Sequence, residues 1–336
     1  MIAFVLSGGG NRGASQAGAL LALLERGIRP DLIIGTSVGA MNSAALALDP
    51  TLAGAQQLGQ RWLEARDADI FPGGRLSAAW RVLTGKGGLH DRKNLRRFIC
   101  TTVSGDARYF ADVRVPCLVT ATVLATGRLR LFGDDPQESL LDALLASTAI
   151  PPLFAPYRYR DEWLADGAIV ANLPLGLALD RGADTIYALE ITDEPEVFAG
   201  PSMGQTLSFS VRAMLSQQHE LERRLTAQGR RKLTVHTLGL SSGQRLAYND
   251  FSATPRLIED GYRSVAAYLD ALPQPRPSGY QRAAAALRAT LQTLAARARP
   301  PAARELLLQL RTKQGARGWG LGARVASPAN PPPELT

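Results

Sequence analysis

The sequence predicts an α/β protein whose sheet is largely parallel and carries helices on both faces. Short apolar runs, such as residues 2–6 and 31–35, alternate along the chain with longer stretches of helical spacing. A continuous apolar run is typical of a strand buried on both faces, as strands of parallel sheets are. Because helical stretches separate these strands, we expect helices to connect them and to cover the sheet.

The amino-terminal half of the chain supplies its elements in a regular order. The strand at 2–6 leads through a glycine-rich loop into a helix, and Gly27 follows that helix, as glycine commonly does. The strand at 31–35 leads into a helix of small residues that stops before Pro50. Further expected elements are helices over 52–66 and 91–103 and a hairpin of strands 115–123 and 128–132 that turns at Thr126 and Gly127.

Residues 67–90 differ in composition from their surroundings. They contain the glycine-rich stretches FPGG and TGKGG and four scattered apolar side chains, those of Phe71, Leu76, Trp80 and Leu83. This composition predicts a loop or flap. Two interpretations of the apolar side chains stay open, because they can cover an acyl pocket or form a small core of the loop itself.

The carboxyl-terminal half continues the alternation of strands and helices. The stretch 157–167 predicts two short edge strands, and Pro174 suits the first turn of a helix. The remaining expected elements are a helix over 138–147, strands at 184–191 and 232–240, a long polar helix between them at about 205–228, and an amphipathic helix over 255–272 that begins at a proline.

The composition bounds the class of protein. Of 336 residues, 46% are hydrophobic, which is enough for a sizeable core and excludes a wholly disordered or fibrous protein. The two cysteines, Cys100 and Cys117, exclude a disulfide scaffold and a multi-cysteine metal site. We see no apolar run of ~18 residues and no basic leader, so we expect no spanning helix, no signal peptide and a cytoplasmic location.

The positive charge is concentrated in the last part of the chain. The formal net charge is +8, and residues 276–336 carry all of this excess. A neutral body argues against a nucleic-acid-binding domain. Together with prolines at 273, 275 and 277, the charge predicts a catalytic domain over 1–272 and a basic, helix-prone and partly disordered extension over 273–336.

The extension contains an amphipathic pattern with two possible uses. Its helix groups Leu287, Leu291 and Leu294 on one side, with arginines elsewhere. A basic amphipathic helix suits peripheral contact with an anionic membrane, at the inner face for a cytoplasmic protein. The same helix could instead dock on the domain or mediate self-association.

A glycine-rich loop follows the first strand and opens a helix. Gly8, Gly10 and Gly13 satisfy the pattern G-x-G-x-x-G. Such a loop can bind a dinucleotide, form an oxyanion hole with its N–H groups, or simply make a tight turn. A dinucleotide site requires an acidic residue after the second strand, whereas Asp31 precedes that strand.

A second motif predicts a nucleophile. Gly35, Ser37 and Gly39 form the pattern G-x-S-x-G between an expected strand and an expected helix. In that context the serine occupies a sharp turn, and the glycines remove side chains that would clash there. The alternative is an ordinary strand-to-helix turn.

The base that would activate this serine has several candidates. His90, His219 and His236 are the histidines of the chain. His90 ends a glycine-rich stretch, and neither His219 nor His236 lies in a loop that follows a strand. Asp166 follows an apolar β-like run and precedes another apolar stretch, so apolar surroundings could raise its pKa. An Asp-Gly pair can equally make a turn without catalytic function.

Three motifs taken together resemble those of the patatin-like phospholipase family. They are GGGNRG after the first strand, GTSVG after the second, and DGA at 166–168. ASTAIPPLFAP (146–156), ADGAIVANLP (165–174) and FSATPRLIEDGY (251–262) are also similar to stretches of its bacterial members. The resemblance covers about residues 1–272.

This resemblance implies a three-layer α/β/α sandwich and a serine acyl hydrolase that cleaves lipid or other acyl esters without a metal or cofactor. It implies Ser37 as the nucleophile and Asp166 as the general base of a histidine-free dyad. Gly167 and Ala168 complete the motif that Asp166 begins. Gly9 and Gly10 would supply the main oxyanion N–H groups, and Arg12 would hold the loop or substrate oxygens. The implied oxyanion loop comprises Gly8, Gly9, Gly10, Arg12 and Gly13. A nucleotide-binding oxidoreductase and a non-catalytic lipid-binding protein remain the alternatives.

Overall fold

The structure is a computed structural model that describes residues 1–71, 80–81, 83–84, 86–103, 109–192, 200, 202–227, 233–244 and 246–272. The chain divides into two compact units, Met1–Leu272 and Pro273–Thr336. All elements given below belong to the first unit. The expected basic extension lies outside the described residues, as does Leu76 of the expected flap.

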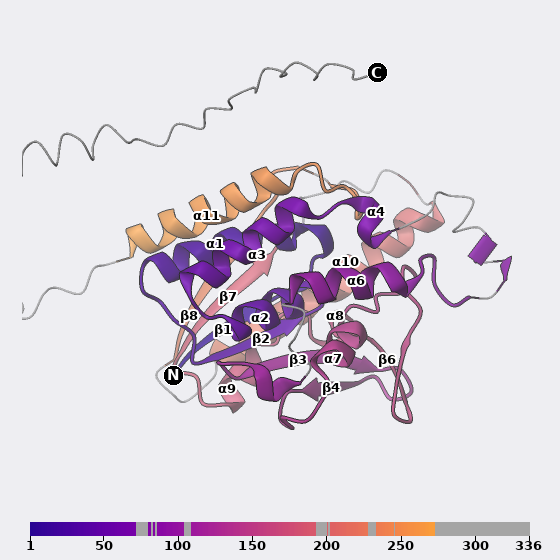
Figure 1. The fold of residues 1–336 in the computed structure, drawn as a ribbon, viewed down its shortest axis with the longest axis horizontal. Coiled ribbons are helices and arrows are strands. Elements are labelled where there is room, and N and C mark those ends of the chain that lie inside the picture. The colour runs from indigo at the N-terminus through magenta and orange to yellow at the C-terminus, as the bar shows by residue number, and fades with distance from the viewer. Residues whose placement is uncertain are drawn as a thin grey trace, which may run out of the picture. The chain divides into compact units, whose positions relative to one another are not determined.

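One mixed sheet of eight strands forms the centre of the described unit (Figure 1). The strands are β1 (Ile2–Leu6), β2 (Leu32–Thr36), β3 (Cys117–Val123), β4 (Arg128–Phe132), β5 (Tyr157–Tyr159), β6 (Glu162–Asp166), β7 (Thr185–Ile191) and β8 (Thr234–Leu240). Their order is β5-β6-β3-β2-β1-β7-β8, and β4 pairs with β3. β1, β2, β3, β7 and β8 pair in parallel, whereas β4, β5 and β6 pair antiparallel.

Helices cover both faces of this sheet. They are η1 (Gly10–Gly13), α1 (Ala14–Glu25), α2 (Val38–Leu48), α3 (Leu52–Glu64), α4 (Asp67–Ile70), α6 (Arg92–Thr102), η2 (Phe110–Asp112), α7 (Leu140–Ser147), α8 (Ala168–Ala171), α9 (Leu175–Asp180), α10 (Met203–Ala227) and α11 (Thr254–Ala271). The expected three-layer α/β/α architecture with a mainly parallel sheet is confirmed.

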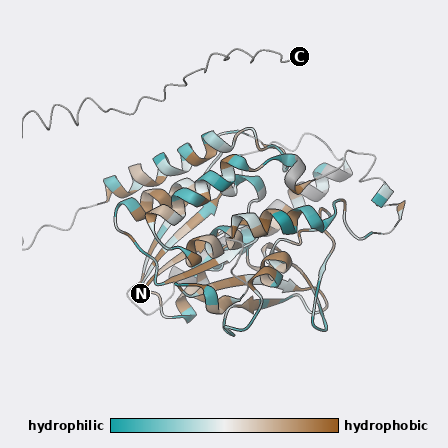
Figure 2. Ribbon diagram, in the orientation of Figure 1, coloured by the Kyte–Doolittle hydropathy of each residue, from teal (hydrophilic) through white to brown (hydrophobic). Residues whose placement is uncertain are grey.

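Alternate side chains of the central strands enter two different cores. Phe4 and Leu6 of β1 pack with residues of α1, α2, α3, α6, α7 and α11. Ala3 and Val5 face the opposite side, where α9 supplies Leu175. Burial on both faces explains why these strands are apolar throughout, and Figure 2 shows them between helices that carry hydrophilic stripes.

Strand β3 brings β2 and β6 onto one of its edges. Residues 117–120 of β3 pair with β2, and residues 121–123 pair with β6. β4 pairs with residues 119–123 and therefore overlaps both. Because a strand has only two edges, β4 occupies one of them, and β2 and β6 must share the other. β2 is parallel and β6 antiparallel to β3, so the two strands approach each other end to end.

The expectation that both strands of 157–167 lie at an edge is wrong for β6. β6 pairs with β3 as well as with β5, so β5 alone of the two has an unpaired edge. The physical reason is that β3 extends beyond the end of β2. The backbone N–H and C=O groups of its last residues would lack partners on that edge without β6.

The expected flap is partly packed against the body of the fold. Phe71 stacks on Phe154 and meets the ring of Tyr248 edge to face, with centroid distances of 5.7 and 5.0 Å. Trp80 and Leu83, in contrast, are 67% and 81% exposed. Phe71 therefore belongs to a cluster with the rest of the domain, whereas these two described residues do not.

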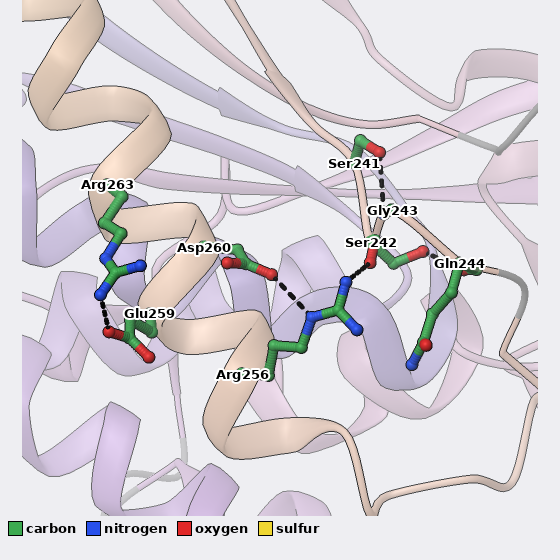
Figure 3. Close-up of polar contacts among 8 residues, drawn as sticks. All are labelled: Ser241, Ser242, Gly243, Gln244, Arg256, Glu259, Asp260 and Arg263. Carbon is green, nitrogen blue, oxygen red and sulfur yellow. Dashed lines mark hydrogen bonds and ion pairs between the residues drawn. The ribbon is translucent and has the colours of Figure 1, made fainter.

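The connection from β8 to α11 is held by side-chain contacts (Figure 3). The Arg256 guanidinium donates to the carbonyl oxygen of Ser242 at 3.1 Å and to the Asp260 carboxylate at 3.2 Å. The Gly243 N–H donates to the Ser241 hydroxyl at 3.0 Å. These contacts fix the loop from which α11 returns across α1.

Helices α1 and α11 cross at two glycines. A Cβ on Gly18 would lie 1.9 Å from the carbonyl oxygen of Ile258, and a Cβ on Gly261 would lie 2.0 Å from that of Ser15. No side chain fits at either position without separating the helices. The crossing therefore depends on the backbones coming into direct contact.

We predict that Gly18→Ala lowers the free energy of unfolding by ~1–3 kcal/mol, because the added methyl group forces the two helices apart. Denaturant unfolding measures this loss. Gly59→Ala in α3 is the matched control, since its Cβ would meet nothing within 4 Å. We expect the control to raise stability by ~0.5–1 kcal/mol through helix propensity. Equal effects of the two substitutions would contradict the contact at the crossing.

Candidate active site

Ser37 lies in the sharp turn between β2 and α2. Its backbone has φ 56° and ψ −126°, a conformation that residues with a side chain rarely adopt. The Ser37 N–H donates to the hydroxyl of Ser147 in α7 at 2.8 Å, which helps to hold the turn. Ser37 is 9% exposed, so it lies at the boundary between the core and the surface. Strain of this kind is typical of functional sites.

The two glycines that flank Ser37 permit close packing of the turn. A Cβ on Gly35 would lie 2.4 Å from the carbonyl oxygen of Gly39. A Cβ on Gly39 would lie 2.5 Å from the carbonyl oxygens of both Leu6 and Ser7. Both glycines of the G-x-S-x-G pattern are therefore required by contacts within the turn and with β1.

Asp166 ends the strand that approaches β2 end to end. Thr36 is opposite Thr120 of β3, and Asp166 is opposite the next residue, Ala121. The serine that follows Thr36 and the carboxyl of Asp166 therefore meet, although 129 positions separate them in the sequence.

The residues after Asp166 hold its carboxyl group in place. The Ala168 N–H donates to Oδ1 of Asp166 at 2.8 Å. A Cβ on Gly167 would lie 2.4 Å from the hydroxyl oxygen of Thr120, so only glycine permits this close approach to β3. The motif at 166–168 thus combines a carboxyl, a close backbone contact and an N–H donor.

Burial makes the Asp166 carboxyl a weaker acid than an exposed aspartate. The residue is fully buried, and the loss of water raises its pKa to about 7. The Ser37 side chain and the Ala168 N–H lower this pKa in part. The second oxygen, Oδ2, is buried and has no hydrogen-bond partner among the described residues. A carboxyl of this pKa can accept a proton near neutral pH.

The glycine loop lies against Ser37. A Cβ on Gly8 would lie 3.1 Å from the Cβ of Ser37. The Gly8 N–H donates to Oδ1 of Asn172 at 3.1 Å, which leaves it unavailable to a substrate. The N–H groups of Gly9 and Gly10 make no hydrogen bond to another described residue. Among the expected oxyanion donors, these two are therefore available.

The other residues of the loop secure its position. The Arg12 guanidinium donates to the carbonyl oxygens of Gly9 at 3.3 Å and Thr192 at 3.4 Å. Arg12 thus connects the glycine loop to the residue that follows β7. Gly13 packs closely on α2, where a Cβ would lie 2.3 Å from a methyl carbon of Val38.

The hydrogen bonds given for Ser37 and Asp166 in the described part of the chain include none to a histidine side chain. His90 is buried and contacts the Tyr248 hydroxyl at 3.3 Å. His236 lies on β8, 3.0 Å from the Tyr268 hydroxyl. The side chain of His219 lies outside the described residues. The geometry therefore favours the carboxyl over the two described histidines as the partner of the serine.

Sequence reasoning missed two residues that position the site. Ser147 receives the N–H of Ser37, and Asn172 receives the N–H of Gly8. Both lie in stretches that resemble the family, but a lone serine or asparagine has no chemical signature of its own. The Asn11 amide in the glycine loop donates to the carbonyl oxygens of Ala247 at 2.8 Å and Asp250 at 2.6 Å.

The geometry does not favour a dinucleotide site. The Asp31 carboxylate accepts the Ile2 N–H at 2.7 Å, at the amino ends of β1 and β2. The glycine loop follows the carboxyl end of β1, which is the opposite end of the sheet. Asp31 therefore cannot hold a ribose bound at that loop. The described residues contain no group of three or more His, Cys, Asp or Glu that could hold a metal ion.

The fold and the site define an α/β protein with a strained serine elbow, a buried aspartate beside it and a glycine loop whose N–H groups lie nearby. A family model described as patatin-like phospholipase matches residues 4–179. The chain therefore belongs to the patatin-like phospholipase family, which confirms the resemblance inferred from the three motifs.

Several named relatives are similar over the same part of the chain. Patatin-like phospholipase domain-containing protein 6 of Mus musculus is 28% identical over 197 residues, which is 58% of this chain and 14% of the relative. The cGAMP-activated phospholipase of Vibrio cholerae is 31% identical over 219 residues, covering 57% of this chain and 59% of the relative. The match thus spans only part of the length of each relative.

A solved structure shows a more distant likeness. VipD from Legionella pneumophila aligns with 80% of this chain and 66% of its own, with 17% sequence identity and a TM-score of 0.46.

The described helices include none that is both long and apolar enough to cross a membrane.

We predict that Asp166→Asn stabilises the protein at pH 8 but not at pH 4. The folded pKa of about 7 lies above the ordinary value of 3.8, so wild-type stability is lost as pH rises through this interval. Asp166→Asn has no carboxyl to ionise at this position, so its stability does not fall in this way. The unfolding free energies of the variant and the wild type should therefore differ by up to ~4 kcal/mol above pH 7. Denaturant unfolding at several pH values measures it. Parallel pH dependence of the two proteins would contradict the raised pKa.

We predict that Asn172→Ala lowers stability by ~1 kcal/mol, because the buried N–H of Gly8 loses its side-chain acceptor at 3.1 Å and keeps only the backbone carbonyl oxygen of residue 172 at 3.4 Å. The matched control is Asn249→Ala, whose half-buried amide makes a 3.3 Å contact with Asp67. Thermal and denaturant unfolding should show the larger loss for Asn172. An equal or smaller loss would mean that Asn172 does not hold the loop.

Proposed function

We propose that this chain is a serine acyl hydrolase that cleaves acyl esters of lipids, of the phospholipase A, lysophospholipase or esterase type. The observation that carries the proposal is the meeting of Ser37 and the buried Asp166 beside the glycine loop. Membership of a family described as patatin-like phospholipase supports a lipid ester as the substrate. The names of the relatives, a phospholipase and a lysophospholipase among them, agree with this class.

The first half of the reaction acylates the serine. Oγ of Ser37 attacks the carbonyl carbon of the ester, and its proton passes to the Asp166 carboxylate. The N–H groups of Gly9 and Gly10 donate to the oxyanion that forms, where losing one donor typically costs ~10²–10³ in rate. The tetrahedral intermediate then expels the alcohol or lysolipid, which takes the proton from Asp166.

The second half of the reaction releases the fatty acid. A water molecule attacks the acyl-enzyme while Asp166 accepts one of its protons. Collapse of the second intermediate breaks the bond to Oγ, and the proton on Asp166 returns to Ser37. The cycle consumes one water molecule. Ser37, Asp166 and the loop N–H groups carry every bond and proton change in it, so this route requires neither a metal nor a cofactor.

The charge distribution supports a contact with membranes. The basic excess in residues 276–336 suits an anionic lipid surface, because each arginine or lysine near such a surface contributes about 1 kcal/mol. We therefore propose a peripheral association in which the catalytic unit meets its lipid substrate at a membrane.

We predict that Ser37→Ala and Asp166→Asn each reduce hydrolysis of a water-soluble short-chain ester at least ~10³-fold. Wild-type kcat/KM should rise with pH and level off, with a midpoint near the Asp166 pKa of about 7, because the base must be ionised. Initial rates over a pH series measure both effects. A fluorophosphonate probe should label the wild type but not Ser37→Ala.

His219→Ala and His236→Ala serve as controls and should retain full activity. Loss of activity in a histidine variant, with Asp166→Asn still active, would contradict the dyad. A wild type that binds lipid but neither hydrolyses the ester nor reacts with the probe would indicate a non-catalytic lipid-binding protein. Binding of NAD, measured by a thermal shift, would instead favour the oxidoreductase.

A further inference from the structure

One end of the sheet carries an exposed row of side chains across three neighbouring segments. Leu124 directly follows β3, and its N–H donates to the carbonyl oxygen of Trp163 in β6 at 2.9 Å. Arg158 of β5 is directly opposite Trp163 in the register. Residues opposite each other on antiparallel strands point to the same face, so the three side chains stand side by side. They are 43%, 50% and 51% exposed.

Two arginines, one in this row and one in the turn that follows β5, stack on aromatic rings. The Arg158 guanidinium carbon lies 5.3 Å from the centre of the Trp163 ring. Arg160, in the turn after β5, lies at the same distance from the ring of Tyr159. Stacking fixes both guanidinium groups beside apolar surface. Nε of Arg158 also donates to the carbonyl oxygen of Arg160 at 3.0 Å, so its terminal N–H groups are the ones that face outward contacts. We call Leu124, Trp163, Arg158 and Arg160 the Trp163 strip.

The positive charge of the strip is largely uncompensated. Arg160 makes no ion pair with another described residue. Arg158 has Asp161 at 3.8 Å, but the Asp161 side chain is fully exposed, so this pair contributes little. Glu162, the other acidic neighbour, forms no ion pair with either arginine in the described contacts. An anionic surface would therefore meet two accessible guanidinium groups.

The strip lies on the strand that ends at the candidate base. Trp163 precedes Asp166 by three residues, which is about 10 Å along a strand. Two further exposed apolar residues are close to Asp166. Ile169 on α8 comes three residues after it in the chain. Ile150 follows Ala149, whose carbonyl oxygen accepts the Asp166 N–H. These two residues lie near Asp166 in the chain, whereas Trp163 itself points to the opposite face of β6 from Asp166, because side chains alternate along a strand.

We propose that the Trp163 strip docks the protein on an anionic phospholipid surface. Trp163 and Leu124 enter the interface between headgroups and acyl chains, where tryptophan is favoured, and Arg158 and Arg160 bind lipid phosphates. A protein partner is less favoured, because a stable interface needs about 800 Å² on each side and the strip offers one short row. The proposal rests on the proposed function in one respect, because a lipid substrate is the reason for this protein to bind a membrane.

The test measures binding of the full chain to vesicles of phosphatidylcholine mixed with phosphatidylglycerol. We expect Arg158→Gln and Arg160→Gln to weaken binding about fivefold each, and Trp163→Ala at least about tenfold. Vesicles of phosphatidylcholine alone should bind more weakly and respond little to the arginine substitutions. Hydrolysis of a water-soluble ester should remain unchanged in all three variants.

The matched controls are Arg114→Gln and Leu63→Ala, which alter an arginine 69% exposed and a leucine 48% exposed outside the strip. Both should bind as the wild type does. If Trp163→Ala fails to fold, the two exposed arginines decide the outcome. Unchanged vesicle binding in the strip variants would overturn the proposal.

The outcomes separate docking from catalysis. Loss of vesicle binding in the strip variants of a chain without esterase activity would retain the docking surface and reject the proposed hydrolysis. Unchanged vesicle binding in strip variants with full esterase activity would reject the docking surface and retain the proposed hydrolysis. A change of oligomeric state in Trp163→Ala, measured by size-exclusion chromatography, would identify the strip as a contact between copies and overturn lipid docking.

Discussion

The site depends on a single edge of strand β3, which two strands share. β2 pairs with the first part of this edge and β6 with the last part, so their ends face each other. The serine turn follows one end and Asp166 forms the other. A shift of either strand by one residue would reverse which of its side chains face each core, so the buried faces fix the register. The same packing that stabilises the sheet therefore determines the distance between Ser37 and Asp166.

Close backbone contacts make this arrangement possible, and buried polar side chains keep it in place. Beneath the glycine loop, the Gln16 amide donates to the carbonyl oxygen of Ser7 and accepts from Asn42, which in turn accepts from the indole N–H of Trp62. These groups join β1 to α1, α2 and α3 in the core. Buried polar groups that are satisfied in this way favour one arrangement of the helices over others.

Burial of Asp166 connects stability with chemistry. Removing water from a carboxylate is unfavourable, and the fold retains that cost because packing elsewhere offsets it. The same desolvation brings the pKa of the group to about 7, where a carboxyl is a far better proton acceptor than an exposed aspartate. A site of this kind illustrates why strain and unfavourable burial concentrate at functional positions.

The sequence by itself determined the fold class, the order of elements and the chemically distinctive residues, because apolar periodicity and the glycine motifs are local signals. It left Asp166 and the histidines as competing bases, since pairing between distant strands has no local signal. Only the tertiary structure brought Asp166 to Ser37, showed β6 inside the sheet, and gave roles to Ser147 and Asn172. Those outcomes depend on which backbone groups remain unpaired once the strands associate, and that is decided by the assembled sheet.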